Sequence, residues 1–555
     1  MVSLDGATSR HVDERPGVEE SATDELEDAV RAALKRFKWL GAVLGVTFLL
    51  VLWELLAVFV FEGKHIMPTP LGVVGGLWQN RVLLRENAGI TLSEASQGWL
   101  WGNALAIILA LLFVVSPPVE AALLRLAIAS YAMPVIAIAP ILNIVFGGDK
   151  PKVVLAAMSV FLTTLVGMSA GLRCADRTSL DLVRAYGGGS WSAVTKVRLW
   201  ASLPSLFAAL RIAAPAALLG AIIGEYLGGT SGLGVAMINA EQSLDVTRVW
   251  SIALFASALA GAGYALTGLV AKYLTPWATS VSTIGAPPAV GSSRRGRVYR
   301  AGRSMLFLLI SVGITVLVWT AFVRLLHLNS YFAKTPLDVW KYLTQGQSAP
   351  GNRAILLNEL TVTLRDASLG YVFGTILAVI AAMAVVTSRA VETMFMPVAV
   401  VLRSVPLVAM TPLIALALGR GLLSVTIIAG IVTFFPTLVN VVQGLRSASE
   451  ESLLLMRSYD ASRLTILRKV QVQSALPSLF SAARIAAPGA LLGAVLAEWL
   501  STGKGLGFYM LEASTESQYN ALWSGVTLIT VVSVAIYAVV GVIEVPILRR
   551  FGPQG

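Results

Sequence analysis

Apolar runs of about 18 or more residues recur along this 555-residue chain. In proteins that cross a bilayer, that length follows from a hydrocarbon core roughly 30 Å thick. Of the residues, 56% are hydrophobic and only 13% are charged, so a set of soluble domains does not fit. The runs therefore predict an all-α membrane protein.

Twelve transmembrane spans are expected, six in each half of the chain. They lie at about 39–61, 96–115, 119–146, 152–172, 204–228, 250–270, 304–326, 368–387, 391–418, 422–443, 477–500 and 522–546. An even number of spans puts both termini on the same side of the membrane. Residues 1–38 are polar and acid-rich, so they are expected to form a tail rather than a secretory signal.

Basic residues indicate which side is cytoplasmic. The segment 271–303 carries six Lys or Arg and no acidic residue, and Arg549 and Arg550 lie close to the C-terminus. The loops 173–203 and 444–476 carry five basic residues each. By the positive-inside rule these segments and both termini are predicted to be cytoplasmic. The rule also accounts for the net charge of +11 without a nucleic-acid partner.

Several kinds of chemistry lack the residues they need. There is one cysteine, Cys174, and the three histidines are far apart, so neither a disulfide framework nor a metal site is expected. The best match to a phosphate-binding loop, Gly503-Lys504-Gly505, lacks the upstream glycine and the following hydroxyl residue. No nucleophile–base–acid set lies inside the spans. We therefore predict no catalytic residue and no cofactor bound by this chain.

The two halves of the chain repeat each other. Residues 203–221 and 476–494 are identical at 16 of 19 positions, at an offset of 273, and matches in the same order extend through both halves. Each copy holds an even number of spans, so the repeats are expected to be parallel, related by an axis along the membrane normal. The predicted organisation is a tail (1–38), a first unit (39–270), a linker (271–303), a second unit (304–547) and a C-terminal tail (548–555).

Charged residues occur at depth in the fifth span of each half. Arg211 and Arg484 lie about 10 Å along the helix from the cytoplasmic end of the predicted span. Charges at such depth usually face a bundle interior or an aqueous cavity. Alternatively, the two arginines extend to the headgroups, and Glu225 and Glu498, near the opposite end of the fifth spans, sit at the outer interface. The candidate path residues are Arg211, Glu225, Arg484, Glu498, Asn143 and Arg403.

A long loop precedes each fifth span. In both copies the pattern predicts a short amphipathic helix, a turn, and a second helix that runs toward the membrane. Either loop alone could be a surface helix without a partner. Duplication at the same place in both halves favours a docking element.

These motifs resemble the membrane permeases of bacterial ABC importers, specifically the nitrate/sulfonate/taurine group, over about 39–270 and 304–546. The signature of that family places Glu-Ala-Ala before a glycine, followed by Ile-x-Leu-Pro. The first loop offers Asp181-Leu182-Val183, then Gly187 and Val197-Arg198-Leu199-Trp200. The second loop departs further, with Leu454-Leu455-Met456 and Asp460 in the corresponding places. Gly232-Leu233-Gly234 and Gly505-Leu506-Gly507, after the fifth spans, are also similar to the family.

The resemblance implies a type I importer permease of a bacterial inner membrane, with two units fused in one chain. Each loop would then be a coupling helix that docks on an ABC ATPase subunit, with ATP and Mg held by a pair of ATPases, expected to be identical. An extracytoplasmic solute-binding protein would deliver a small polar solute or anion of the sulfonate, nitrate, taurine or pyrimidine-precursor type. The implied coupling residues are Asp181, Arg184, Ala185, Tyr186, Gly187, Trp191, Arg457, Ser458, Tyr459, Asp460 and Leu464.

Two further expectations follow from these residues. Because only the first loop keeps an acidic residue and the glycine in place, its dock is expected to be the tighter of the two. The alternative function is an ion-coupled secondary transporter with two six-helix halves. Such carriers tend to hold carboxylates at mid-membrane, and these spans have few of them.

Overall fold

A computed structural model describes residues 50–60, 67–116, 135–277, 297–325, 327–404 and 407–551, with a few further residues between 43 and 124. Every regular element in this part of the chain is a helix, as predicted. Eight of these helices are long and apolar enough to cross a membrane, and shorter apolar helices occur at Gly45–Phe59 and Val312–Leu325. The predicted tail, 1–38, lies outside the described residues.

The first half has a simple helix order. Its elements are η1 (Leu56–Val60), α2 (Pro70–Gln79), α3 (Arg81–Val115), α5 (Val135–Phe146), α6 (Lys150–Arg173), α7 (Arg177–Ala185), α8 (Ser190–Ala193), η3 (Val194–Arg198), α9 (Leu199–Tyr226), α10 (Leu233–Gln242) and α11 (Val246–Leu274). The fifth span, α9, continues from the second helix of the loop through the short π-helix η3.

The second half follows the same order. Its elements are α12 (Arg297–Leu325), α13 (Pro336–Thr344), α14 (Ala349–Thr387), α15 (Arg389–Ser404), α16 (Leu407–Leu418), α17 (Leu422–Arg446), α18 (Glu450–Ser458), α19 (Arg463–Ile466), η4 (Leu467–Gln471), α20 (Val472–Ala497), η5 (Glu498–Thr502), α21 (Leu506–Thr515) and α22 (Tyr519–Phe551). Even the π-helix recurs, since η4 lies 273 residues after η3.

Small residues bring three helices of each half close together. In the first half α6 packs against both α3 and α9, and in the second α17 packs against α14 and α20. A Cβ atom added at Gly220 would lie 2.8 Å from the Cα of Ala156, and one at Gly493 would lie 2.8 Å from the Cα of Ala429. Such close approach is typical of lipid-embedded helices, because they associate through tight backbone packing.

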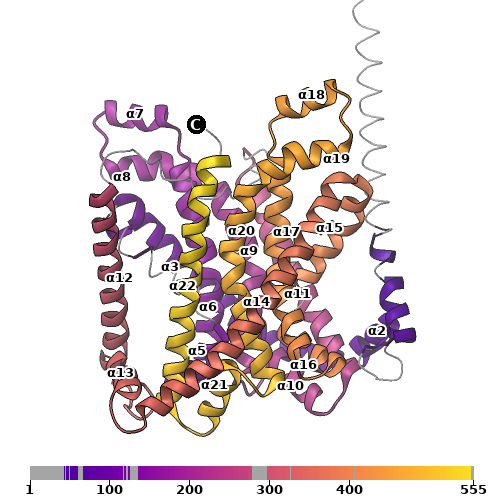
Figure 1. The fold of residues 1–555 in the computed structure, drawn as a ribbon, viewed down its shortest axis with the longest axis vertical. Helices are drawn as coiled ribbons and strands as arrows, with labels where there is room; N and C mark the ends of the chain where they lie inside the picture. The colour runs from indigo at the N-terminus through magenta and orange to yellow at the C-terminus, as the bar shows by residue number, and fades with distance from the viewer. Residues whose placement is uncertain are drawn as a thin grey trace, which may run out of the picture.

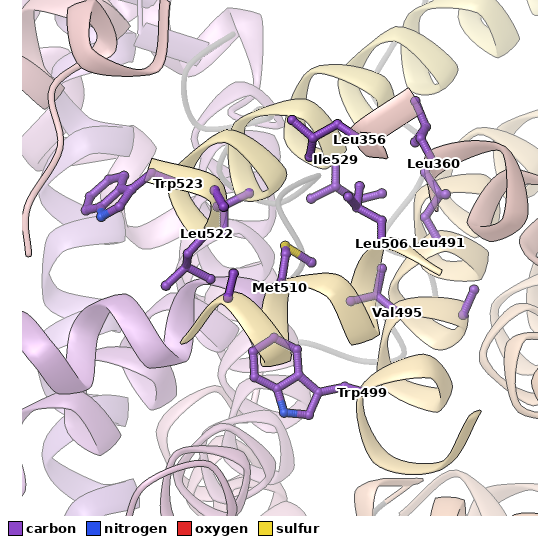
Figure 2. Close-up of a cluster of buried hydrophobic side chains, with 14 of the residues drawn as sticks. Leu356, Leu360, Leu491, Val495, Trp499, Leu506, Met510, Leu522, Trp523 and Ile529 are labelled. Carbon is purple, nitrogen blue, oxygen red and sulfur yellow. The ribbon is translucent and has the colours of Figure 1, made fainter. Parts of the chain in front are cut away.

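A dense apolar core lies in the second half, where α21 packs against α14, α20 and α22. Figure 2 shows Leu491, Val495, Leu506 and Met510 grouped with side chains of α14 and α22. The same cluster takes in residues of the first half, among them Ile141, so the two halves share this core.

The two long loops protrude from one end of the bundle. In Figure 1, α7 and α18 lie at the top, while α10, α13 and α21 lie at the bottom. We refer to these as the loop end and the far end. Both predicted loop structures are confirmed: α7 and α18 are short helices, each followed by a turn and a helix that runs into the fifth span.

The first helix of each half reaches across to the other half. Gly45, near the start of the first helix, lies against the backbone of Met394 in α15. Phe146 of α5 meets Phe322 of α12 edge to face, with ring centroids 5.9 Å apart. The halves are therefore joined by reciprocal contacts as well as by the linker.

Several predicted span limits differ from the observed helices. The spans expected at 96–115 and 368–387 belong to helices that begin at Arg81 and Ala349. Their first turns are polar, so hydropathy registers only the apolar part. The span predicted at 391–418 is described as α15 and α16 on either side of residues 405–406.

Candidate functional site

The turn of the first loop depends on a glycine. Gly187 has φ +76°, and its N–H donates to the Arg184 carbonyl at 2.9 Å. The N–H of Gly188 donates to the Val183 carbonyl at 2.8 Å, which closes the end of α7. At the other end Asp176 caps α7 by accepting from the Ser179 N–H at 3.0 Å. That bond, with a second from the Ser179 hydroxyl, holds the pKa of Asp176 below its usual range.

The second loop reproduces the turn with a different residue. Asp460 has φ +52°, so it takes the left-handed conformation that Gly187 takes in the first loop. The Asp460 N–H donates to the Arg457 carbonyl at 2.9 Å. Ser449 caps α18 in place of Asp176.

Both loops carry large exposed side chains. Tyr186 is 86% exposed and Tyr459 is 78% exposed, and they occupy equivalent positions beside the turn. Trp191 and Leu464 are also exposed. Asp181 and Arg184 form an exposed ion pair at 3.1 Å, which contributes little to stability because solvent screens it. Of the other predicted coupling residues, Ala185, Arg457 and Ser458 lie on the ends of α7 and α18.

A cavity of about 460 Å³ lies between the two halves near the far end. Asn143 lines it, and its side-chain amide donates to the Leu227 carbonyl at 3.2 Å. Tyr226 and Trp499, equivalent residues directly after the repeated glutamates, face this cavity from opposite halves. The structure thus places one predicted path residue, Asn143, between the halves, where the ends of both fifth spans meet.

The two sides of this cavity differ. The Tyr226 hydroxyl donates a hydrogen bond to Glu241 of α10. Burial raises the pKa of Glu241 to about 7, against the opposing effect of that hydrogen bond. At the equivalent positions the second half has Trp499 and Ser514, which also line the cavity. Sequence reasoning missed Tyr226 and Trp499, although an aromatic residue follows the repeated glutamate in both halves.

Glu225 and Glu498 each hold a glycine turn. Both carboxylates are essentially fully buried. Glu225 accepts from the Gly234 N–H at 2.7 Å, and Glu498 accepts from the Gly507 N–H at 2.8 Å. Added Cβ atoms at Gly232 and Gly505 would collide with these carboxylates, and both glycines have positive φ. In this conformation each glutamate ties the end of the fifth span to the helix that follows it.

A buried lysine distinguishes the first glutamate cluster from the second. The Nζ of Lys152 lies 3.1 Å from Glu94 and 2.7 Å from Asp149, and the lysine side chain is 1% exposed. In this part of the repeat the offset is 272, so the positions equivalent to Lys152, Glu94 and Asp149 hold Ser424, Asp366 and Gly421. Within the described residues no three His, Cys, Asp or Glu side chains are placed to hold a metal ion.

Arg211 and Arg484 both pack on the sixth span of their own half. The Arg211 guanidinium lies 4.0 Å from the centroid of the Tyr264 ring in α11. Arg484 lies 4.3 Å from that of Tyr537 in α22. Arg211 is exposed within the chain and Arg484 is partly so. The side chain of Arg403 lies outside the described residues.

The fold and this arrangement define a class. An all-α chain of two parallel repeats, which meet around an open cavity near one end and present paired loops at the other, has the architecture of a transport permease. Residues 102–280 and 374–551 match the family described as "binding-protein-dependent transport system inner membrane component". The chain belongs to this family and contains its unit twice, so it is a multi-pass inner-membrane permease of an ABC importer for small solutes.

Individual relatives agree with the presence of two units. A probable ABC transporter permease of Haemophilus influenzae is 33% identical over 40% of this chain and 90% of its own length. The riboflavin transport permease RibX of Chloroflexus aurantiacus is 33% identical over 45% of this chain and 94% of its own. The putative aliphatic sulfonates permease SsuC of Bacillus subtilis is 27% identical over 40% and 82%. Each relative thus aligns over most of its own length but covers less than half of this chain. No solved structure matches the chain significantly.

Membership of this family favours the ATP-driven importer over the ion-coupled carrier. The predicted unit boundaries and the roles of the individual site residues stay predictions.

Proposed function

We propose that this permease moves a small polar solute or anion along a path between its two halves. Separate ATPase subunits drive it through the loops around α7 and α18. The observation that supports this is the pair of equivalent loops at one end of the bundle, each presenting an exposed tyrosine beside a left-handed turn. Tyrosine and tryptophan side chains are common anchors at protein interfaces because they bury a large area with few rotatable bonds.

The same assignment orients the chain. If the loops dock on ATPases, the loop end is cytoplasmic and the far end faces the solute-binding protein. The charge pattern agrees, since both loops and the segment 271–303 are basic. Both termini would then be cytoplasmic.

The cavity near the far end would be part of the path. It lies where α5 and the end of α9 meet η5 and α21 of the other half. In alternating access, rocking of one half against the other would open and close this contact. The relatives for sulfonates and riboflavin indicate that the solute is small, and the substrate class is taken up below.

A matched pair of glycine substitutions tests the coupling assignment. Gly187 and Gly189 both have open space around an added Cβ, but only Gly187 has positive φ. Gly187→Val should distort the turn, because a β-branched residue is strained there by about 1–3 kcal/mol. Gly189→Val, with ordinary φ, serves as the control.

The measurement is transport and ATPase activity of the assembled transporter in proteoliposomes. We expect Gly187→Val to lower the number of solute molecules moved per ATP at least severalfold while the permease still inserts. Gly189→Val should leave that ratio near the wild-type value. Unchanged coupling in Gly187→Val would remove the docking role of the first loop.

A further inference from the structure

The two fifth-span arginines are equivalent in sequence and in their packing. Each guanidinium stacks on a tyrosine of the sixth span, Tyr264 or Tyr537. Each also lies against a glycine one turn further along, where an added Cβ would come within 3.0 Å of Arg211 or 3.2 Å of Arg484. The tyrosine and glycine contacts that hold the two arginine side chains are therefore the same in both halves.

The polar surroundings of the two arginines differ. In the second half, Glu544 lies 3.4 Å from Arg484 and accepts from the Ser481 hydroxyl at 2.8 Å. The equivalent positions in the first half are Ala271 and Ala208. Two substitutions thus remove the carboxylate and the hydroxyl that orients it.

Because of this difference, Arg484 has a carboxylate beside it and Arg211, within the described part of the chain, does not. Glu544 is nearly buried and neutralises Arg484. Among the described residues no carboxylate pairs with Arg211, and its side chain is exposed. An uncompensated guanidinium within a membrane-spanning helix is costly unless water or an anion reaches it. The two alanines beside it are small and partly exposed, so they leave room for such a group.

We propose that Arg211, supported by Tyr264, binds the anionic group of the transported solute, and that Arg484 does not. The guanidinium presents paired N–H donors that suit a carboxylate or sulfonate group, and stacking on the tyrosine holds it in place. The substrate class is therefore a small organic anion, bound on one side of the path only. This proposal rests on the proposed path between the halves.

Cysteine labelling tests the charge at both sites without the unidentified solute. In a Cys174→Ser background, Ala208→Cys and Ser481→Cys place a thiol at equivalent positions beside the two arginines. Each variant, purified in nanodiscs, is treated with sulfonatoethyl methanethiosulfonate, itself a small organic anion, and with the cationic trimethylammonioethyl analogue. The measurement is the ratio of the two labelling rates.

We expect the ratio of anionic to cationic labelling at Ala208→Cys to exceed that at Ser481→Cys by roughly tenfold, as expected for one nearby unscreened charge. Adding Arg211→Gln should abolish the preference, whereas Arg484→Gln should leave it unchanged. Adding Glu544→Ala to Ser481→Cys should create a preference in the second half.

Equal ratios at the two thiols would overturn the anion site while leaving the path intact. If neither thiol reacts with either reagent, the arginines do not face water, and both the path and the anion site are wrong. In the assembled transporter, Ala271→Glu should reproduce the pairing of the second half and lower transport at least tenfold, whereas Glu544→Gln should not. Undiminished transport in Ala271→Glu would also overturn the proposal.

Discussion

The two halves of this permease share a backbone plan but differ in their buried charges. The first half pairs Lys152 with Glu94 and Asp149, whereas the second has a serine in place of that lysine. The second half pairs Arg484 with Glu544, whereas the first has Ala271 in place of that glutamate. Each half thus contains an ion pair that the other lacks.

What stays the same in both halves is what the fold requires. The glutamate that holds the glycine turn, the close helix packing and the left-handed loop residue recur. What differs includes the two ion pairs and the residues of the loop turns. The two units of one chain therefore differ in chemistry while they share one architecture.

The buried lysine should contribute most to the stability of its half. Lys152→Met leaves Glu94 buried without its cation, which should lower the free energy of unfolding by about 3–5 kcal/mol. Ser424→Ala, at the equivalent position, removes one neutral hydrogen bond to the Gly419 carbonyl and should cost only about 1 kcal/mol. Denaturant unfolding of the purified permease measures both. Adding Glu94→Gln to Lys152→Met should recover part of the lost stability. Equal losses in Lys152→Met and Ser424→Ala would mean that the buried ion pair contributes no more than the neutral hydrogen bond.

The second effect concerns the docking loops. Tyr186→Ala should weaken ATPase binding by roughly tenfold, as expected for loss of an interface anchor. Tyr459→Ala should weaken it less, because the second loop lacks both the acidic residue and the glycine of the first. Binding of the partner ATPase to nanodisc-embedded permease gives both values. Equal losses would mean that the asymmetry of the loops has no functional weight.

A smaller effect concerns the turn of the second loop. Asp460→Gly should stabilise the left-handed turn by about 1 kcal/mol or less, since glycine has no Cβ penalty there. Gly187→Asp should destabilise the first turn by a similar amount. Hydrogen exchange at the amides of Gly188 and Ala461, which close the two turns, reports these changes. Faster exchange in Asp460→Gly would contradict this reasoning.

The smallest effect depends on pH. Because hydrogen bonds lower the pKa of Asp176, its cap on α7 is complete above the ordinary aspartate range and is lost as pH falls through the lowered value. The cap of α18, Ser449, does not titrate in this range. Exchange at the Ser179 amide, corrected for its intrinsic rate, should rise below about pH 4, while that at Ser452 should not. Asp176→Asn should remove the pH dependence, and a parallel rise at Ser452 would refute the assignment.

Much of the fold could be predicted from the sequence. The recurrence of residues 203–221 at an offset of 273 and the apolar runs predicted two helical repeats, and the loop patterns predicted α7 and α18. The polar first turns of α3 and α14 concealed where those helices begin, because hydropathy averages do not register them.

The candidate site was less predictable. The spacing of Glu225 from Gly234 does not reveal that a carboxylate binds a turn amide, since that contact depends on how the chain reverses after α9. The partner of Arg484 comes from a helix 60 residues away, so only the packed structure reveals it. The pairing of Tyr226 with Trp499 across the cavity likewise depends on contact between the halves.

The contact of each first helix with the other half has a consequence for proteolysis. Because Gly45 packs on α15 and Phe322 packs on α5, each half contacts the other through its own first helix. A protease cut within 278–296 would therefore leave two fragments that co-migrate as one particle. The peptide connection would then ensure that the two units are made in a one-to-one ratio. After synthesis, the contacts of each first helix with the other half would hold the units together.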